Sequence, residues 1–264
     1  MIELFGRFLN LQERGYGPVS FVILVIIALA TYWLFSKSKA SPWFTNSEEV
    51  LPPFLAVPAI LFAMLAAALA TDVWQKHTAA KDAVIHEASA VRSMMHISKQ
   101  LGEQGVQLEK STREYINAVI NQEWPAMVSY DHGHKEAAFN ALQSLDSTAS
   151  NIGNTNQLSR FNAQRLQTAL ETIQVSRLQR ISLAHDSISI AKWASAMVLA
   201  VLTLVSIAVV HVKRPRAMVI SMVITILCVM ATIQVLSRNR SPFLGTAAIS
   251  NTILIESVKA FDNK

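Results

Sequence analysis

Residues 193–236 read WASAMVLAVLTLVSIAVVHVKRPRAMVISMVITILCVMATIQVL. Two apolar runs, Trp193 to His211 and Ala217 to Leu236, lack Asp, Glu, Lys and Arg and are separated by the basic turn VKRPR at 212–216. A helix needs about 20 apolar residues to cross the hydrocarbon core of a bilayer, which is about 30 Å thick. The stretch therefore predicts a hairpin of two membrane-spanning helices.

Two more apolar stretches precede this hairpin and predict two further spans. The first, Val19 to Phe35, is uncharged and has Tyr32 and Trp33 where the aromatic residues of a membrane interface are expected. The second runs from about Phe54 to Val73. A cleaved signal peptide is the competing interpretation of the first stretch, but the apolar run is longer than usual in such peptides and no persuasive small-residue cleavage site follows it. We therefore expect four transmembrane helices.

The composition agrees with a lipid environment. Hydrophobic residues make up 52% of the 264-residue chain and charged residues 16%, against about 25% charged in an ordinary soluble domain. The formal net charge is +5, yet residues 75–188 hold eleven basic and eleven acidic side chains. The positive excess therefore lies in and around the apolar stretches, where lipid headgroups select it, and needs no nucleic-acid partner. Cys228 is the single cysteine, which excludes an intramolecular disulfide and a cysteine-based zinc site.

Residues 75–188 show the three- and four-residue periodicity of helices. An apolar stripe continues the second span into water, at His77, Ala80, Val84, Ala88, Val91 and Met95. A second helix is expected from about Val106 to Glu123, with Pro125 marking its boundary, and a weaker one around 135–145. The polar segment Ser147 to Asn156 predicts a loop. A last stripe leads into the third span, at Leu166, Leu170, Ile173, Ile181, Ala184 and Ile188.

These elements predict an all-α membrane protein with four transmembrane helices and a helical extramembrane bundle between the second and third. The expected divisions are an N-terminal membrane region at 1–74, the extramembrane domain at 75–188, the membrane hairpin at 189–240 and a C-terminal tail at 241–264. The tail predicts a short amphipathic helix at the membrane interface, with its apolar side at Ile249, Ile253, Leu254 and Val258.

Several short motifs follow one another in a fixed order along these spans. They are Val73-Trp74-Gln75, Glu87-Ala88, Tyr115 followed by Glu123-Trp124-Pro125, Arg177-Leu178 with Arg180, and Pro242-Phe243-Leu244-Gly245. On these motifs, the region from about Leu61 to Ile249 resembles the bacterial bestrophin-like domain family, proposed distant relatives of the bestrophin anion channels. It departs from that pattern at 186–188 and 238–241. The resemblance implies a fold and a channel-like assembly, but no established activity.

The second span is unusually rich in small residues. One face, which would let helix backbones approach closely, carries Ala59, Ala63 and Ala67. Another face, a candidate pore constriction that gates by dewetting, carries Phe62, Leu65 and Leu69. The alternative interpretation is ordinary helix packing and lipid contact, and it is favoured because apolar residues are expected in any membrane span.

Charged residues lie on or beside the apolar stripes of the predicted bundle helices. Glu87 lies beside the stripe of the first bundle helix, and Arg177 occupies a stripe position in the last one, with Arg180 nearby. Charges that face a bundle interior are costly unless paired. We therefore expect Glu87 to form a structural ion pair with Arg177 or Arg180 that fixes helix register, rather than a catalytic site.

Other chemistry is not indicated by the sequence. The stretch Asp131-His132-Gly133-His134 has metal-ligand character, but its two histidines lack further ligands, which favours a solvated turn. No glycine-rich phosphate loop, Ser-His-Asp pattern or metalloprotease signature occurs. We therefore predict no catalytic residue, no metal and no cofactor.

Two classes of function are favoured by the sequence. The first is an oligomeric ion channel or pore, with the second span nearest the axis and an anion implied by the resemblance. The alternative is a membrane sensor or signalling scaffold whose helical domain binds a ligand or partner. A membrane-bound enzyme ranks last because no polar constellation converges. The expected surroundings are the lipid bilayer of the bacterial inner membrane, further copies of the chain and a small ion.

Membrane topology supplies a direct test. With four spans, both termini and residues 75–188 share one side, and the turn at 212–216 lies on the other. Basic residues beside the spans are almost evenly divided, so the side of the extramembrane domain stays open. Reporter fusions at Asn154 and Arg214 should give opposite signals, and equal signals would refute the four-span topology.

Overall fold

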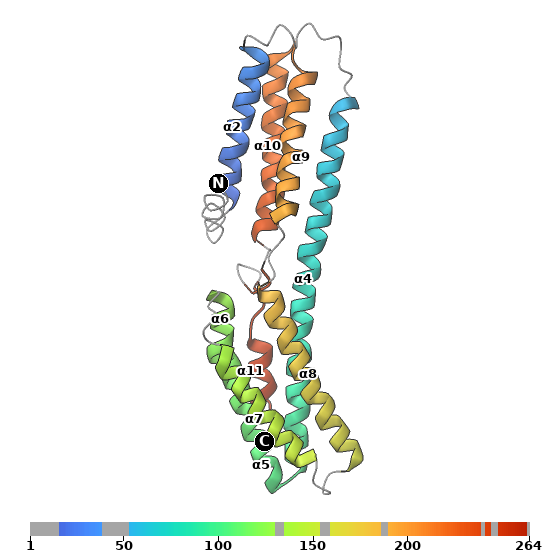
Figure 1. Ribbon diagram of the computed structural model, residues 1–264, viewed down its shortest axis with the longest axis vertical. Coiled ribbons are helices and arrows are strands. Elements are labelled where there is room, and N and C mark those ends of the chain that lie inside the picture. Colours follow the sequence, from blue (N-terminus) through green and yellow to red (C-terminus); the bar gives the residue numbers. More distant parts are fainter. Residues whose placement is uncertain are drawn as a thin grey trace. The chain divides into compact units, whose positions relative to one another are not determined.

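The computed structural model describes residues 16–38, 53–129, 135–153, 159–185, 190–238, 241–243 and 248–262. All regular secondary structure in these ranges is helical, which confirms the all-α prediction (Figure 1). The chain divides into two compact units. We name them the membrane unit, Met1–Trp74 with Ile188–Arg240, and the bundle unit, Gln75–Ser187 with Ser241–Lys264.

The membrane unit is built from apolar helices. They are α2 (Tyr16–Ser36), the first part of α4 (Pro53–Gln100), α9 (Ile190–Val210) and α10 (Pro215–Arg238). Within the described ranges, three segments are long and apolar enough to cross a bilayer, namely Ala56–Gln100, Ala191–Val210 and Pro215–Leu236, while the apolar part of α2, Ser20–Ser36, is shorter. The hydroxyl groups of Thr203 and Ser206 donate to the Leu199 and Leu202 carbonyls, which pairs these donors within α9.

Helices α2, α9 and α10 pack side by side in the membrane unit (Figure 1). Their buried contact residues include Leu24, Ala28, Ala200 and Leu204. Alanine at these contacts lets the backbones approach closely. Helix α4 contributes Leu69 and Val73 to a smaller cluster with Ala196 of α9 and Leu236 of α10. One face of α4 is therefore covered by other helices of the same chain.

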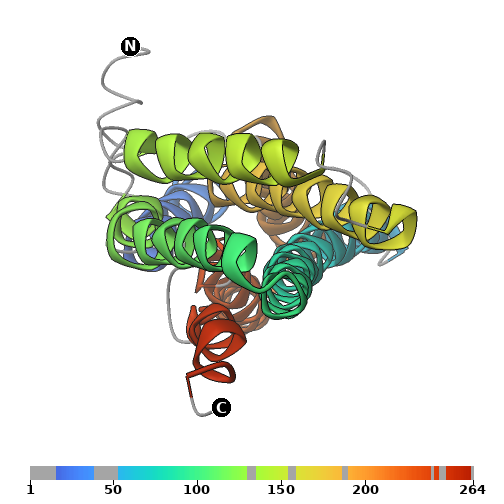
Figure 2. The same cartoon turned by 90° about the horizontal axis from the view of Figure 1, so that it is seen from below.

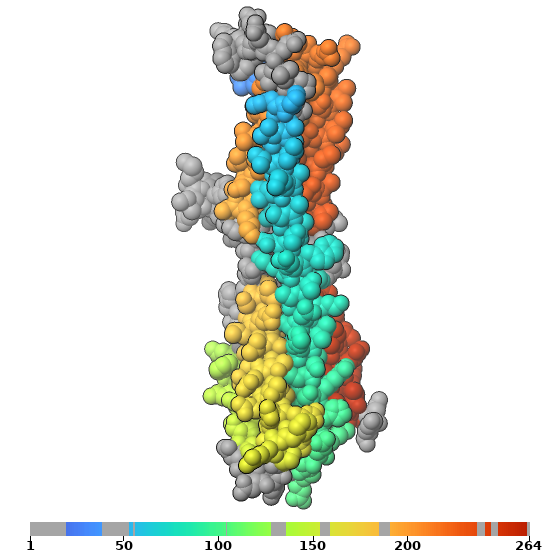
Figure 3. All heavy atoms as spheres, turned by 90° about the vertical axis from the view of Figure 1, so that its right-hand side faces the viewer, coloured from blue at the N-terminus to red at the C-terminus, as the bar shows by residue number. Residues whose placement is uncertain are grey.

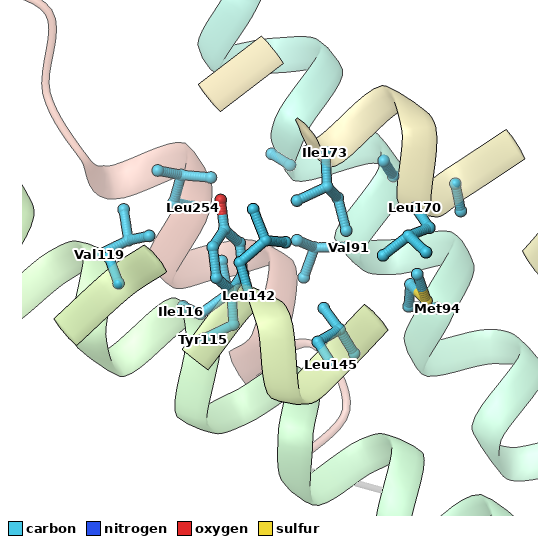
Figure 4. Close-up of a cluster of buried hydrophobic side chains, with 14 of the residues drawn as sticks. Val91, Met94, Tyr115, Ile116, Val119, Leu142, Leu145, Leu170, Ile173 and Leu254 are labelled. Atoms are coloured by element: carbon cyan, nitrogen blue, oxygen red, sulfur yellow. The ribbon is translucent and has the colours of Figure 1, made fainter. Parts of the chain in front are cut away.

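The bundle unit continues α4 and adds shorter helices. These are α5 (Glu103–Ala118), the π-helix η2 (Val119–Glu123), α6 (Trp124–Ser129), α7 (Lys135–Gly153), α8 (Arg160–His185) and α11 (Thr252–Lys259). Seen end-on, α4, α5, α7 and α8 surround a common core (Figure 2). Figure 4 shows their side chains meeting there, among them Val91, Tyr115, Leu142, Ile173 and Leu254 of α11.

A glycine turn connects α4 to α5. Gly102 has a φ of 59°, a left-handed conformation that glycine adopts without strain. A Cβ atom on Gly105 would lie 1.7 Å from the carbonyl oxygen of Ser98, so only glycine fits there. The two glycines therefore let the start of α5 lie directly against the end of α4.

Helix α7 corrects the loop predicted at Ser147 to Asn156. The helix continues through Gly153, and 154–156 lie outside the described residues. Its buried stripe extends through Leu145, Ala149 and Ile152. The Thr148 hydroxyl donates to the Ser144 carbonyl inside the helix. Apolar periodicity thus outweighs the turn preference of Ser, Thr and Asn in this segment.

Helix α11 packs into the bundle unit with its apolar side against protein, while its location at the membrane interface stays a prediction. Leu254 is fully buried in the core. Beyond the helix, Phe261 packs edge-on against His96, with ring centroids 4.9 Å apart, and Asp262 binds Arg113 at 2.6 Å. An amphipathic pattern marks one apolar face but does not say whether lipid or protein covers it.

Replacing Leu254 with alanine tests this placement of the tail. Removal of a buried leucine side chain leaves a cavity and costs about 2–5 kcal/mol of unfolding free energy. We expect the melting temperature of the purified protein to fall clearly. The matched change Leu178→Ala, at a side chain 70% exposed, should leave it nearly unchanged. Melting of Leu254→Ala at the wild-type temperature would contradict the burial of α11.

Candidate functional site

Five polar side chains from four helical segments meet inside the bundle unit. They are Glu87 of α4, Tyr115 of α5, Glu123 of η2, and Arg177 and Arg180 of α8. Arg177 is 9% exposed and the other four are 0% exposed. Such groups are rarely found fully buried unless they are paired. Their grouping is therefore the strongest candidate for a functional or organising site among the described residues.

Glu87 is held by two different helices. The Tyr115 hydroxyl donates to its Oε1 at 2.6 Å. Arg180 donates from Nε to Oε2 at 2.8 Å and from Nη2 to Oε1 at 3.0 Å. The guanidinium group thus binds the carboxylate through two parallel hydrogen bonds, the strongest geometry available to this pair. These bonds join α4 to α5 and α8.

Glu123 accepts hydrogen bonds from both arginines. Arg180 Nη2 donates to Glu123 Oε1 at 2.8 Å, in addition to its bond with Glu87. Arg177 donates from Nε to Glu123 Oε2 at 2.9 Å, and its Nη2 donates to the same oxygen. Arg180 therefore bridges two carboxylates from different elements. Two guanidinium groups balance two carboxylates within the network.

Soft, polarisable groups complete the surroundings of Arg180. Its Nη1 lies 3.0 Å from the Met127 sulfur. Its guanidinium carbon lies 5.5 Å from the centroid of the Trp124 ring, a cation–π distance. Trp124 in turn packs edge-on against Phe243, with centroids 5.5 Å apart. The aromatic pair shields the charges from water on this side.

The π-helix η2 presents Glu123 to the arginines. Its wider turn lets the Trp124 N–H donate to the Val119 carbonyl, five residues earlier. Pro125 follows directly; it has no N–H to donate, and its ring would clash with an earlier carbonyl in a regular helix. The π turn accommodates that ring, so the helical run continues into α6 instead of ending at the predicted boundary. Such single π turns often mark functional sites.

Burial and neighbouring charges raise the pKa of both Tyr115 and Arg180. Burial and the neighbouring Glu87 carboxylate raise the pKa of Tyr115 well above its ordinary value, so the phenol remains a neutral donor. Burial alone lowers the pKa of a guanidinium group, but Glu87 and Glu123 outweigh that effect and raise the pKa of Arg180. Tyr115 and Arg180 therefore both keep their protons near neutral pH.

The family of the chain follows from comparison with known proteins. The profile of the bestrophin-like domain matches residues 22–254. The chain belongs to the bestrophin-like family. This confirms the family resemblance deduced from the motifs. No protein of curated function matches the chain.

Solved structures share the fold of this chain. They include variants of a bacterial bestrophin homologue from Klebsiella pneumoniae, each carrying one substitution. One is 8% identical, with a TM-score of 0.67 over 93% of this chain and 97% of that chain. Two others are 9% and 8% identical, with TM-scores of 0.65 and 0.66 over 92% of this chain and 96% of theirs. At such identities the likeness shows the fold.

The network of this bestrophin-like protein contains one of the two alternative pairs expected for Glu87, the pair with Arg180. Glu87 binds Arg180, whereas Arg177 binds Glu123. Glu123 and Tyr115 were not among the predicted site residues. The signal for Glu123 was its place just before Trp124-Pro125, because a proline that follows a helical run makes a regular turn impossible there. The Asp131-His132-Gly133-His134 stretch lies outside the described residues.

The predicted faces of α4 fall on different sides of the helix. Leu69 is 1% exposed in the cluster with Ala196 and Leu236, and Phe62 and Leu65 are half-buried against the same cluster. The small-residue face is more open, with Ala59 half-buried and Ala63 and Ala67 exposed. The predicted constriction residues and the predicted alanine face therefore lie on different sides of α4.

A double-mutant cycle tests the coupling inside the network. The substitution Glu123→Gln removes the carboxylate to which the buried Arg177 binds. This loss costs about 3–5 kcal/mol of unfolding free energy. The double variant with Arg177→Met should lose much less than the sum of the single losses. Thermal melting of the purified protein measures all three. Strictly additive losses would show that Glu123 and Arg177 act independently.

A solvent-exposed pair provides the control for this cycle. Lys110 and Glu114 are 4.0 Å apart with side chains 66% and 54% exposed. Exposed pairs of this kind are worth about 0.3–0.5 kcal/mol on a helix. Glu114→Gln should therefore leave the melting temperature almost unchanged. A loss comparable to that of Glu123→Gln would mean that charge removal itself, rather than burial, destabilises the bundle.

Proposed function

We propose that this bestrophin-like protein is one subunit of a homo-oligomeric ion channel in the bacterial inner membrane, with four spans and α4 nearest the axis. Family membership and the apolar helices support a membrane protein of channel type. The observation that carries the proposal is an uncovered apolar face of α4. Val57, Leu61 and Met64 are 58%, 48% and 66% exposed there. In a ring of copies, such a face can meet a common axis.

The packing of α4 selects which residues face that axis. A side chain that lines a shared pore must be one that its own subunit leaves uncovered. Leu69 does not meet this condition because α9 and α10 bury it, and Leu65 is partly covered by the same cluster. Leu61 and Met64 do meet it. The proposed constriction therefore moves from Phe62, Leu65 and Leu69 to the face with Leu61 and Met64.

The alanine face of α4 is proposed to contact the neighbouring subunit. Ala63 and Ala67 are exposed in the single chain. Small side chains at this spacing let a second helix approach closely in a membrane, where packing rather than the hydrophobic effect drives association. Three faces of one helix thus receive three roles: the subunit's own core, the neighbouring copy and the axis.

A hydrophobic gate fits the chemistry of this span. Apolar side chains around a narrow axis close it by dewetting. Asp72 is the single acidic residue in the described part of the membrane unit, and it binds Lys192. Ion selectivity therefore arises at the ends of the pore rather than within the span. The bestrophin family favours an anion as the conducted species.

The fourth span of the proposal is α2. The helix has 21 residues, within the roughly 17–25 that cross a bilayer. It packs against α9 and α10 through the buried Leu24 and Ala28, as a neighbouring membrane helix would. Its outward side chains are apolar, with Ile26 and Leu29 59% and 63% exposed. Lipid is the solvent that such a surface suits.

Conductance in planar bilayers tests the arrangement of the α4 faces. Shortening a side chain that faces the axis widens a hydrophobic constriction. Leu61→Ala and Met64→Ala should therefore pass larger or leakier currents than the wild type. Leu65→Ala is the matched control, because it loses a contact within the subunit and should lower the melting temperature rather than change the current.

Other outcomes of this experiment separate the alternatives. A current change confined to Phe62→Ala and Leu65→Ala would return the constriction to the face predicted from the sequence. Silent bilayers for every variant, together with a monomeric mass in nanodiscs, would contradict the channel. The membrane sensor would then be the better proposal, and one observation favours it: a groove on the bundle unit, between α4 and α8, that combines polar and apolar side chains.

A further inference from the structure

A groove of about 420 Å³ runs between α4 and α8 in the bundle unit. Figure 3 shows the surfaces of these two helices side by side. Buried alanines form the floor, Ala90 from α4 and Ala169 from α8. Because neither carries more than a methyl group, the helices leave a trough instead of interlocking side chains. Its volume falls in the range of roughly 300–1,000 Å³ that small-molecule sites occupy.

Polar groups line the walls of this groove. Ser89 and Ser93 project from α4, and Gln164 and Thr168 from α8. Their side chains have no hydrogen-bond partner among the described residues, so their donors are available to a ligand. A further hydroxyl that lines the groove, that of Thr172, donates to the Thr168 carbonyl. The walls thus offer hydroxyl and amide donors from two opposing helices.

The charge of the groove is positive. Arg165 lines it, is half-buried and has no ion-pair partner among the described residues. Its guanidinium carbon lies 5.6 Å from the centroid of the Phe161 ring, which restrains the side chain. No carboxylate lines the groove. The acid nearest in sequence on α8, Glu171, accepts a hydrogen bond from Gln167 and lines a separate groove between α7 and α8.

We propose that this groove binds a small organic anion. Its carboxylate or phosphate would lie against Arg165, whose planar fork of donors matches such oxyanions, with hydroxyls of Ser93 and Thr168 as further donors. Its apolar part would lie against Phe161, whose side chain is 67% exposed. The site lies wholly in the bundle unit, and the proposal holds whether or not the chain conducts ions.

Calorimetric titration with benzoate tests the site. The full-length protein in nanodiscs should bind benzoate, and should bind the neutral isostere benzamide at least about tenfold more weakly, because the charge-assisted bonds are lost. Arg165→Gln should weaken benzoate binding by a similar factor. Arg160→Gln is the matched control: it removes an exposed arginine of the same helix that does not line the groove, and should leave binding unchanged.

A second pair of variants tests the apolar part of the site. Phe161→Ala should weaken benzoate binding severalfold, whereas Phe139→Ala, at an exposed ring of α7, should not. Melting temperatures of all variants should match the wild type, since each change is at the surface. Equal binding of benzoate and benzamide, equal losses in the two arginine variants, or no binding of either benzoate or phenyl phosphate at millimolar concentration would overturn the proposal.

Discussion

The buried guanidinium group of Arg180 is the interaction on which the bundle unit depends. It is 0% exposed and binds Glu87 of α4 and Glu123 of η2 at distances of 2.8–3.0 Å. Removing such a charge from water costs several kcal/mol, which only complete pairing offsets. The chain meets this condition when α4, η2 and α8 are all in place. A misaligned bundle would leave an arginine or a carboxylate buried alone, so the network selects one register among otherwise similar apolar packings.

The same network shows how far sequence reasoning extends. Glu87 and Arg180 could be found because each interrupts or borders an apolar stripe of regular helical period. Glu123 was missed because a π turn changes the face on which a residue lies, and regular helical periodicity does not include that change; Pro125 is the one sign of it in the sequence. Thr148 illustrates the opposite error, since its loop-like composition concealed a helix whose apolar stripe continues. Amino-acid composition therefore predicts secondary structure poorly in a segment whose conformation is determined by tertiary packing.

The membrane unit was predictable for a different reason. Long apolar runs reflect the solvent, and the requirement that every backbone donor be paired in lipid leaves helices as the simplest solution. The role of each face of α4 was less accessible. Phe62, Leu61 and Leu65 are equally apolar in the sequence, and only the contacts with α9 and α10 distinguish the covered residues from the open ones. The C-terminal helix α11 presented the same ambiguity, because protein and lipid both accept an apolar face.

The hydrogen bonds of Glu87 also constrain helix α4. Its buried residues lie on one side of the helix; they are Leu69, Val73, Ala80, Val84 and Glu87. Fixing Glu87 against Arg180 and Tyr115 therefore also fixes the rotation of α4 about its own axis. A rotation of one residue, about 100° in an α-helix, would remove Glu87 from its partners and leave a carboxylate buried alone. The charge network thus determines which face of α4 packs into the core of the bundle unit.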